Sequence, residues 1–142
     1  MKTFAAGYVA AFAVAPLLVS GDDAQVEKHG QHSAVKLEHV LAGHLSELNG
    51  RYKLRVTEVA YDPAGFIGEH HHAGPGIRCV TAGELTYVQS GRTVVYKSGD
   101  CFFESGDVTH TAVNRTNNST VLLNFELLPV DWAQGSAIAA PR

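Results

Sequence analysis

Short apolar runs alternate with turn residues along most of the chain. Tyr52, Leu54 and Val56 alternate with polar residues, which is the period of two expected of a half-buried strand. Further runs rich in β-branched and aromatic residues lie at 84–89, 92–97, 101–104 and 120–129, separated by glycine-containing turns. Many short strands joined by such turns predict an all-β fold, either a sandwich or a barrel.

The segments that flank this pattern are less regular. Residues 35–48 form the only candidate helix, but Gly43 in their middle weakens that prediction. Residues 22–34 are polar, and we expect them to form a loose leader. We place the barrel itself at 35–130. The tail at 131–142 is small and polar, and we expect it to be partly disordered.

The N-terminus has the pattern of a secretory signal peptide, which we place at 1–21. Lys2 supplies a short positive region, and 4–19 is an uncharged, mostly apolar run. We expect cleavage before Asp22 or as late as residue 24. A retained membrane anchor is the alternative, but the run is shorter than the ~20 residues that a spanning helix needs. We therefore expect a periplasmic or secreted protein with no membrane span after processing.

Composition narrows the classes of function. The chain has 142 residues, 45% of them hydrophobic and 18% charged, which indicates one globular domain. The formal net charge is −3 and no basic cluster is present, so nucleic acid is not an expected partner. Eight histidines stand beside only two cysteines. This excludes a cysteine-rich zinc fold and leaves a histidine-ligated metal open.

Three consecutive histidines are the first candidate for chemistry. On a strand, His70 and His72 share one face, while His71 faces the other way. Two imidazoles on one face can bind a single Fe, Mn, Ni, Cu or Zn ion. A histidine cluster on the surface is the alternative. We expect no chemical role for the remaining histidines before residue 50, namely His29, His32, His39 and His44.

A second motif strengthens the metal hypothesis, because the two motifs together resemble the cupin superfamily. The first cupin motif is matched by His70-x-His72 followed by Gly83 at the expected offset. The second motif is matched by Gly99, His110 and Asn114. Two of its usual residues differ, since Ser105 and Asp107 stand where Pro and Gly are common. The resemblance covers roughly 50–128 of this sequence.

The resemblance implies a fold and a set of ligands. The fold is the double-stranded β-helix, or jelly-roll barrel, made of two sheets. His70, His72 and His110 would project inward to one divalent metal ion, with Fe(II) favoured. Asn114 would support the neighbouring hairpin rather than contact the metal.

One departure from the family pattern defines the expected site. The fourth cupin ligand is usually Glu, and its position holds Gly76. Glu69 should face outward and Glu84 should lie beyond the metal, so we expect three neutral histidines and no carboxylate. Such a site keeps more Lewis acidity and more open positions for an anionic or enolate-like substrate, or for substrate plus O₂. A degenerate site without metal is the alternative.

Strand alternation from Gly76 identifies substrate-binding candidates. Arg78 and Val80 should face inward and Cys79 outward, unless a bulge reverses the pattern. An inward Arg78 could bind a substrate carboxylate. The alternative is an arginine that reaches the rim and pairs with Glu58 or Glu104. Five strand aromatics are candidates for the barrel lining, namely Tyr87, Tyr96, Phe102, Phe103 and Phe125, and of these Tyr87 and Phe103 are substrate-binding candidates. The alternative is that they are ordinary core residues.

The cupin arrangement also places the two cysteines near each other. Its strand pairing puts residue 79 opposite roughly residue 102, so Cys79 and Cys101 are a disulfide candidate in an oxidising compartment. Such a bond could stabilise the fold by about 3 kcal/mol. Small cupins commonly form dimers, and an exposed edge around 35–60 makes a homodimer plausible.

These observations lead to one functional hypothesis and two rivals. The first is an exported, metal-dependent cupin of the dioxygenase type that acts on a small anionic or enolisable molecule. The second is a sugar or sugar-acid isomerase, although the sequence shows no clear general acid or base for that reaction. The third is a non-catalytic protein that binds a small molecule or a metal.

Overall fold

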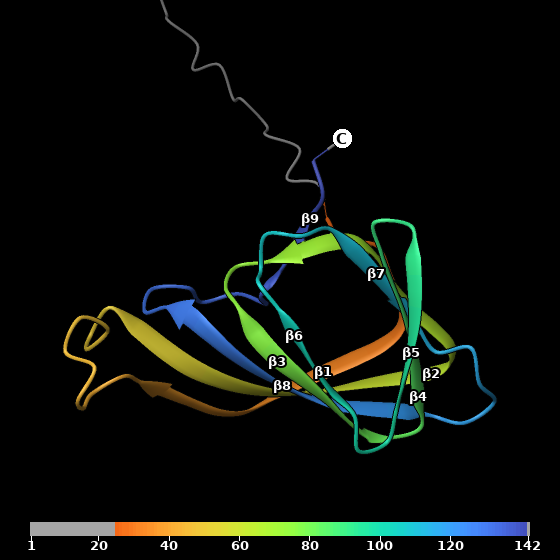
Figure 1. The fold of residues 1–142 in the computed structure, drawn as a ribbon, viewed down its shortest axis with the longest axis horizontal. Helices are drawn as coiled ribbons and strands as arrows, with labels where there is room; N and C mark the ends of the chain where they lie inside the picture. Colours follow the sequence, from red (N-terminus) through yellow and green to blue (C-terminus); the bar gives the residue numbers. More distant parts are fainter. Residues whose placement is uncertain (1–24, 142) are drawn as a thin grey trace, which may run out of the picture.

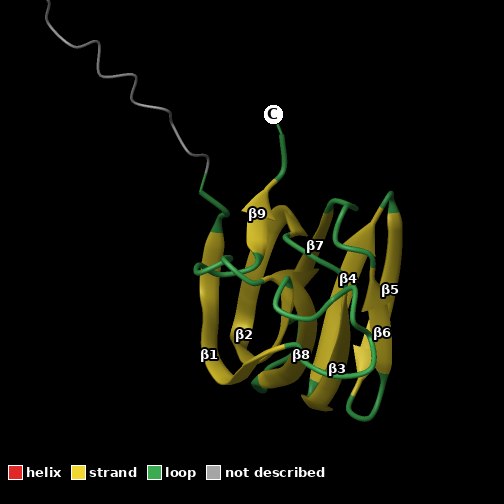
Figure 2. Ribbon diagram, turned by 90° about the vertical axis from the view of Figure 1, so that its left-hand side faces the viewer, coloured by secondary structure: helices red, strands yellow, loops and turns green. Residues whose placement is uncertain are grey.

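Nine antiparallel strands form a nearly closed barrel in the computed structural model, which describes residues 25–141. The expected signal peptide at 1–21 lies outside the described residues. The strands surround a common axis in Figure 1, and Figure 2 shows them from the side, joined by loops alone. They are β1 (Lys28–Val40), β2 (Tyr52–His72), β3 (Gly76–Ala82), β4 (Glu84–Gln89), β5 (Arg92–Lys97), β6 (Cys101–Glu104), β7 (His110–Val113), β8 (Thr120–Pro129) and β9 (Ala137–Ala139). The all-β prediction is confirmed.

The long strand β2 connects the two halves of the barrel. The strand order is β5-β4-β7-β2-β8-β3-β6, with β1 and β9 also paired to β2. The first half of β2 pairs with β8 over Tyr52–Tyr61, and its second half pairs with β7 from Phe66 to His70. A bulge lies between Ile67 and His70 on β2. The three consecutive histidines therefore lie in the second half of β2, which pairs with β7 and β9 rather than with β8.

Alternation along β3 places polar residues inside the barrel. Gly76, Arg78 and Val80 are buried, whereas Ile77 is exposed and Cys79 is half-buried. The pairing of β3 with β6 is continuous from Gly76 to Cys79, so no bulge reverses the pattern. The inward orientation expected of Arg78 is the one found.

The apolar core occupies one part of the interior. Its buried members come from β2, β3, β4, β7 and β8, and they are Val59, Tyr61, Ile67, Val80, Leu85, Ala112 and Leu122. Branched and aromatic side chains at alternate strand positions fill this part of the barrel interior. The charged side chains described below occupy the rest of the interior.

The N-terminal boundary differs from the expected one. Residues 28–34 belong to β1 rather than to a loose leader, and the helix expected within 35–48 is wrong. Strand pairing overrides local propensity here, because β1 pairs along most of its length with Lys53–Ile67 of β2. The β1–β2 hairpin, drawn in brown to gold in Figure 1, projects beyond the ring of the other strands.

The C-terminal tail is also ordered, contrary to expectation. Ala137–Ala139 forms β9, which pairs with His70–His72. Before it, Arg55 donates hydrogen bonds to the carbonyl oxygens of Gln134 at 2.7 Å and Trp132 at 2.9 Å. A buried guanidinium with these backbone acceptors holds the tail against the barrel.

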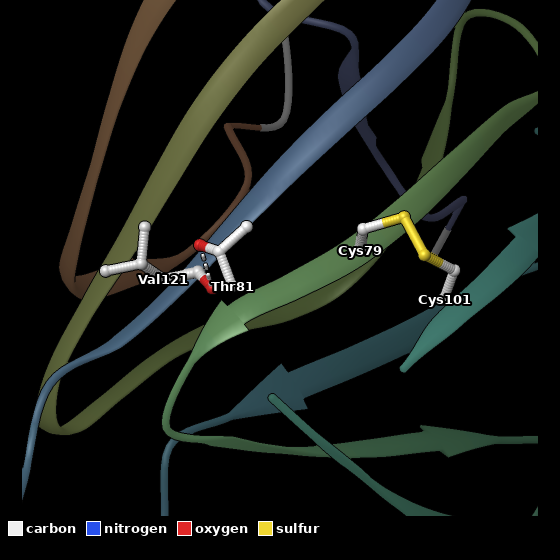
Figure 3. The surroundings of a disulfide bond; sticks show 4 residues. All are labelled: Cys79, Thr81, Cys101 and Val121. Carbon is white, nitrogen blue, oxygen red and sulfur yellow. Dashed lines mark hydrogen bonds between the residues drawn. A yellow bond between two sulfur atoms is a disulfide. The ribbon is translucent and has the colours of Figure 1, made fainter. Parts of the chain in front are cut away.

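A disulfide joins β3 to β6 on the outer surface of the barrel (Figure 3). Cys79 and Cys101 are direct cross-strand partners with Cα atoms 4.1 Å apart. Residue 79 thus lies opposite 101, within one position of the expected partner, and the Cys79–Cys101 disulfide candidate is confirmed. Further along β3, Thr81 Oγ1 donates a hydrogen bond to the carbonyl oxygen of Val121 on β8 at 3.1 Å. No helix among residues 25–141 has the length and apolar character needed to span a membrane.

Candidate metal centre

The three histidines expected to bind a metal converge inside the barrel. His70 and His72 come from the end of β2, and His110 begins β7 directly opposite His70. One ring nitrogen from each histidine lies within 4.8 Å of those of the other two. All three side chains are almost completely buried. The bulge in β2 and the start of β7 thus bring together ligands that are far apart in the sequence.

Hydrogen bonds orient the histidine rings. His70 Nδ1 lies 2.8 Å from the carbonyl oxygen of Gly68, and His110 Nδ1 lies 3.0 Å from that of Val108. A carbonyl only accepts hydrogen bonds, so each Nδ1 carries the proton and each neutral ring keeps a lone pair on Nε2. Metal-bound histidines commonly show this arrangement, in which a partner on one nitrogen orients the other toward the ion.

The third histidine has a carboxylate partner. His72 Nδ1 lies 3.1 Å from Ser136 Oγ and 3.4 Å from Glu126 Oε1. Ser136 also donates a short hydrogen bond to Glu126. The ordered tail therefore completes the surroundings of His72, because Ser136 directly precedes β9.

Burial keeps His70 and His72 in the neutral form that binds metals. It lowers the pKa of His70 to about 3, with a further contribution from the nearby His110 ring. It also lowers the pKa of His72. Both imidazoles are neutral at pH 7, which is the ligand form of histidine.

The expected absence of a carboxylate from the site is wrong. Glu104, at the end of β6, places Oε1 2.9 Å from His110 Nε2 and Oε2 3.2 Å from His72 Nε2. Its side chain is buried, as is that of Glu126 on β8. Two glutamates therefore lie beside the histidines, although the usual position in the first motif is a glycine.

Strand register explains where these glutamates come from. Gly76 on β3 is directly opposite Glu104 on β6 and directly opposite Glu126 on β8. Side chains at opposed positions point to the same face of a sheet. A Cβ atom at Gly76 would lie 2.6 Å from the carbonyl oxygen of Phe125 and would also collide with the Arg78 guanidinium. The space at Gly76 is therefore filled by Arg78 instead of by a carboxylate.

Arg78 pairs with both glutamates. Its Nε lies 2.6 Å from Glu104 Oε2, and its Nη2 donates a hydrogen bond to Glu126 Oε1 at 3.0 Å. Burial favours the protonated form of Glu104, but contact with His110 and the charge of Arg78 outweigh it and hold its pKa well below the usual range. The pKa of Glu126 is lowered in the same way despite its burial, by His72 and Arg78. Contacts with the histidines and with Arg78 thus keep the two buried carboxylates ionised.

These residues belong to a charged row that crosses five strands. The row, which we call the polar row, consists of the successive cross-strand partners Glu38 on β1, Arg55 on β2, Glu126 on β8, Gly76 on β3 and Glu104 on β6. Glu38 accepts hydrogen bonds from Lys53 at 2.9 Å and from Arg55 at 2.6 Å. With the Arg78 guanidinium over Gly76, the charge alternates in sign from Glu38 to Glu104. Each carboxylate in the row therefore has a cation beside it.

Sequence reasoning missed the glutamates because it followed one motif along one strand. A signal was present in the alternation of β8, where Leu122, Glu126 and Leu128 are all buried. A charged residue at an inward position of an apolar strand is an indicator of a site. The same applies to Glu104 at the end of β6.

The site opens into a cavity of about 540 Å³. Its walls include the three histidines, both glutamates and Arg78, together with apolar side chains such as Ile67, Leu85 and Phe102. Tyr87 packs against His110 with ring centroids 4.8 Å apart and an angle of 28°. This volume suits a small organic molecule.

Not every aromatic candidate faces this cavity. Phe103 is 69% exposed and Phe125 is also exposed, because strand alternation turns both outward. Their place as lining residues is therefore wrong. Phe102, which is also one of the lining candidates, does line the cavity and stacks on Tyr96 with ring centroids 4.0 Å apart.

Asn114 supports a loop, as expected, and does not contact the histidine site. Its buried Nδ2 donates to the carbonyl oxygens of Tyr61, Asp62 and Asn118 at 2.7–3.2 Å. Its Oδ1 accepts hydrogen bonds from the backbone N–H and the hydroxyl of Thr116. The side chain thus fastens the β7–β8 connection to the middle of β2.

The fold and site together define a class, that of small β-barrel proteins with a buried cluster of histidines that could hold a metal ion. The family model described as "Cupin domain" matches residues 57–126. The chain belongs to the cupin superfamily, which confirms the resemblance seen in its motifs. No curated protein sequence matches the chain.

Solved structures share the fold. The polyketide cyclase RemF from Streptomyces resistomycificus aligns with a TM-score of 0.59 and 16% identity over 83% of this chain and 80% of that chain. An uncharacterized conserved protein with a double-stranded β-helix domain from Klebsiella pneumoniae aligns at 0.54, with 21% identity over 78% and 85%. An RmlC-like cupin from Shewanella frigidimarina aligns at 0.53, with 20% identity over 75% and 87%. At these identities the likeness concerns the fold alone.

Proposed function

We propose that the chain is a metal-dependent cupin enzyme of the dioxygenase type that acts on a small anionic or enolisable organic molecule. The observation that carries this proposal is the arrangement of the three imidazoles. Their Nδ1 atoms are oriented by Gly68, Val108 and Ser136, so that three Nε2 lone pairs remain for one ion. A bound divalent ion, with Fe(II) favoured, would supply Lewis acidity and positions for substrate and O₂.

The protein side chains would bind and orient the substrate. Arg78 Nη1 is buried and has no hydrogen-bond partner among the described residues, which supports Arg78 as a contact for a substrate oxygen. Tyr87 forms a wall beside His110, and the apolar part of the cavity excludes water. The ionised Glu104 and Glu126 disfavour a second anion close to Arg78. The substrate should therefore carry few negative charges.

A second candidate is acid–base chemistry of the isomerase or cyclase kind. The sequence showed no general base, but Glu104 and Glu126 are buried carboxylates that line the cavity. The polyketide cyclase RemF has a similar fold, which agrees with this candidate without identifying a substrate. A reaction of this type would consume no O₂.

Two measurements test the proposal. Metal analysis of the purified protein should show close to one divalent ion per chain, and less than about 0.2 equivalents after Fe(II) reconstitution would refute a metalloenzyme. Oxygen uptake with diketones, thiols and aromatic acids should then show equimolar consumption of O₂ and substrate. Substrate conversion without O₂ uptake would favour the acid–base candidate. Metal binding with no conversion in any panel would favour a non-catalytic binding protein.

We also propose that the protein is exported and forms a homodimer. The Cys79–Cys101 disulfide supports a periplasmic or secreted location, because such bonds persist in oxidising compartments. Strand β1 supports a dimer, because Val35 and Leu37 on it are exposed. Cell fractionation and light scattering of the purified protein check the two statements. A cytoplasmic, reduced protein or a monomer at high concentration would contradict them.

A further inference from the structure

The carboxylate oxygens of Glu104 lie as close to two of the histidine nitrogens as two ligands of one metal ion lie to each other. Its oxygens are 2.9 Å from His110 Nε2 and 3.2 Å from His72 Nε2. Two donor atoms bound to one zinc-sized ion at ~2.0–2.2 Å, with angles near 90–110°, lie about 2.8–3.6 Å from each other. Both separations fall in this range. Each Glu104 oxygen therefore lies at the separation expected between two donor atoms that share one ion, Oε1 from His110 and Oε2 from His72.

The hydrogen bonds of His110 leave the contact between its Nε2 and Glu104 without a proton, so that a cation is needed between the two atoms. The proton of His110 is on Nδ1, where it meets the carbonyl oxygen of Val108. With the proton on Nδ1 alone, the Nε2 lone pair would face an acceptor oxygen of Glu104 at 2.9 Å. Two acceptors at this distance repel each other unless a proton or a metal ion lies between them. The convergence of His70 on the same point favours a metal ion over a single proton.

The polar row explains how Glu104 could bind a metal and stay oriented. Its Oε2 lies 2.6 Å from Arg78 Nε, while Oε1 is the oxygen nearest to His110. A carboxylate can bind a metal through one oxygen while the other remains in an ion pair with a neighbouring cation. Because Gly76 is directly opposite Glu104, the carboxylate occupies the same rung of the sheet as the missing motif residue.

We propose that Glu104 is the fourth protein ligand of the ion held by His70, His72 and His110. The carboxylate has moved from β3 to the facing position on β6, and Arg78 holds it there. This inference rests on the proposed metal site. It changes that site from three neutral ligands to three neutral ligands and one anion, which lowers the net charge of a bound divalent ion from +2 to +1.

Cobalt binding to the full chain tests the inference without an assay of activity. Co(II) affinity and the visible absorption spectrum of bound Co(II) are measured for the wild type, Glu104→Gln and Glu69→Gln. Glu69 is an exposed residue of β2 and provides the same chemical change outside the barrel. We expect Glu104→Gln to weaken Co(II) binding by about 10- to 100-fold and to shift the spectrum. Glu69→Gln should change neither.

The alternative role of Glu104 is that of a counter-ion for Arg78 alone. In that case Glu104→Gln would lower the melting temperature of the metal-free protein and leave Co(II) affinity and spectrum unchanged, which would overturn the inference. A wild type that binds no Co(II), Fe(II) or Zn(II) would overturn the proposed metal site as well. The two failures are thus distinguishable.

A crystal structure of the zinc-loaded wild type tests the same point if Glu104→Gln does not fold. A Glu104 oxygen at ~2.0–2.2 Å from zinc would support the inference. A Glu104 carboxylate that lies more than about 3 Å from a zinc ion bound to the three histidines would overturn it.

Discussion

Arg78 Nη2 donates a hydrogen bond to Glu126 Oε1 at 3.0 Å, and each residue is only 2% exposed. The contact links the middle of β3 to β8 inside the barrel. Nε of the same guanidinium forms an ion pair with Glu104 on β6. A single cation therefore pairs with two carboxylates whose charged forms burial would otherwise disfavour.

Removal of the Arg78 guanidinium should lower the free energy of unfolding. We expect Arg78→Met to destabilise the protein by about 3–5 kcal/mol, because it leaves buried charges without a partner. Urea denaturation of the metal-free protein measures the loss. The triple variant Arg78→Met, Glu104→Gln, Glu126→Gln should recover part of it. A loss below about 1 kcal/mol for Arg78→Met would show that water already solvates the two carboxylates.

The disulfide should stabilise the fold without contributing to the metal site. We expect the double variant Cys79→Ser, Cys101→Ser to lose about 3 kcal/mol, since the bond closes a loop between residues separated by 22 positions. Metal affinity under native conditions should be unchanged, because Cys79 faces away from the histidines. Thermal unfolding with and without reductant, followed by metal titration, checks both statements. Equal melting temperatures for the oxidised and reduced wild type would contradict the first.

Asn114 offers a test of a purely structural role. We expect Asn114→Ala to destabilise the protein by about 2–4 kcal/mol, because several buried backbone groups lose their partner. Metal binding by the folded fraction should match that of the wild type. Asn114→Asp, which keeps Oδ1 but loses the Nδ2 donor, should also be destabilised. Loss of metal from a variant that is still folded would show that Asn114 acts on the site.

Glu38 should make stability depend on pH. Hydrogen bonds from Lys53 and Arg55 lower its pKa in the folded protein. The stabilisation is therefore complete above the unfolded pKa of about 4.3 and is lost as the pH falls through the folded pKa. We expect the wild type to exceed Glu38→Gln in stability at pH 7 by at most about 1 kcal/mol, since this partly exposed pair is screened by solvent.

Denaturation at several pH values measures that difference. It should shrink steadily as the pH falls below about 4. Glu47→Gln, a change at an exposed position in the β1–β2 loop, serves as the control and should show no such trend. A difference for Glu38→Gln that stays constant to pH 2 would contradict the assigned ion pairs.

The sequence was sufficient to predict the fold and the three histidines. Period-two alternation and glycine turns indicated an all-β barrel, and the offsets of His70, His72 and His110 matched two motifs in the right order. The orientation of Arg78 also followed from alternation along one strand. Each of these predictions depends on residues that are close in the sequence or on a known motif.

The features that the sequence did not predict depend on contacts between strands that are distant in the chain. Strand β1 was missed because its polar residues have no strand signal of their own, and pairing with β2 provides the order. The role of Glu104 required the register between β3 and β6, which a motif on β3 does not contain. Phe103 was misplaced for a related reason. Phe103 and Glu104 are neighbours on β6, so their side chains point to opposite faces. Because Glu104 faces inward, Phe103 faces outward.

The same alternation gives the disulfide a role beyond stability. If β6 slipped by one residue against β3, Glu104 would turn to solvent and Phe103 would enter the cavity. A short strand of four residues has few contacts of its own to prevent such a slip. A covalent bond between Cys79 and Cys101 prevents it, because these residues are three positions from Gly76 and Glu104 on the same two strands. Oxidation of the thiols during folding would thus select which side chain of β6 faces the histidines, and assembly of the site would be coupled to the redox state of the compartment in which the chain folds.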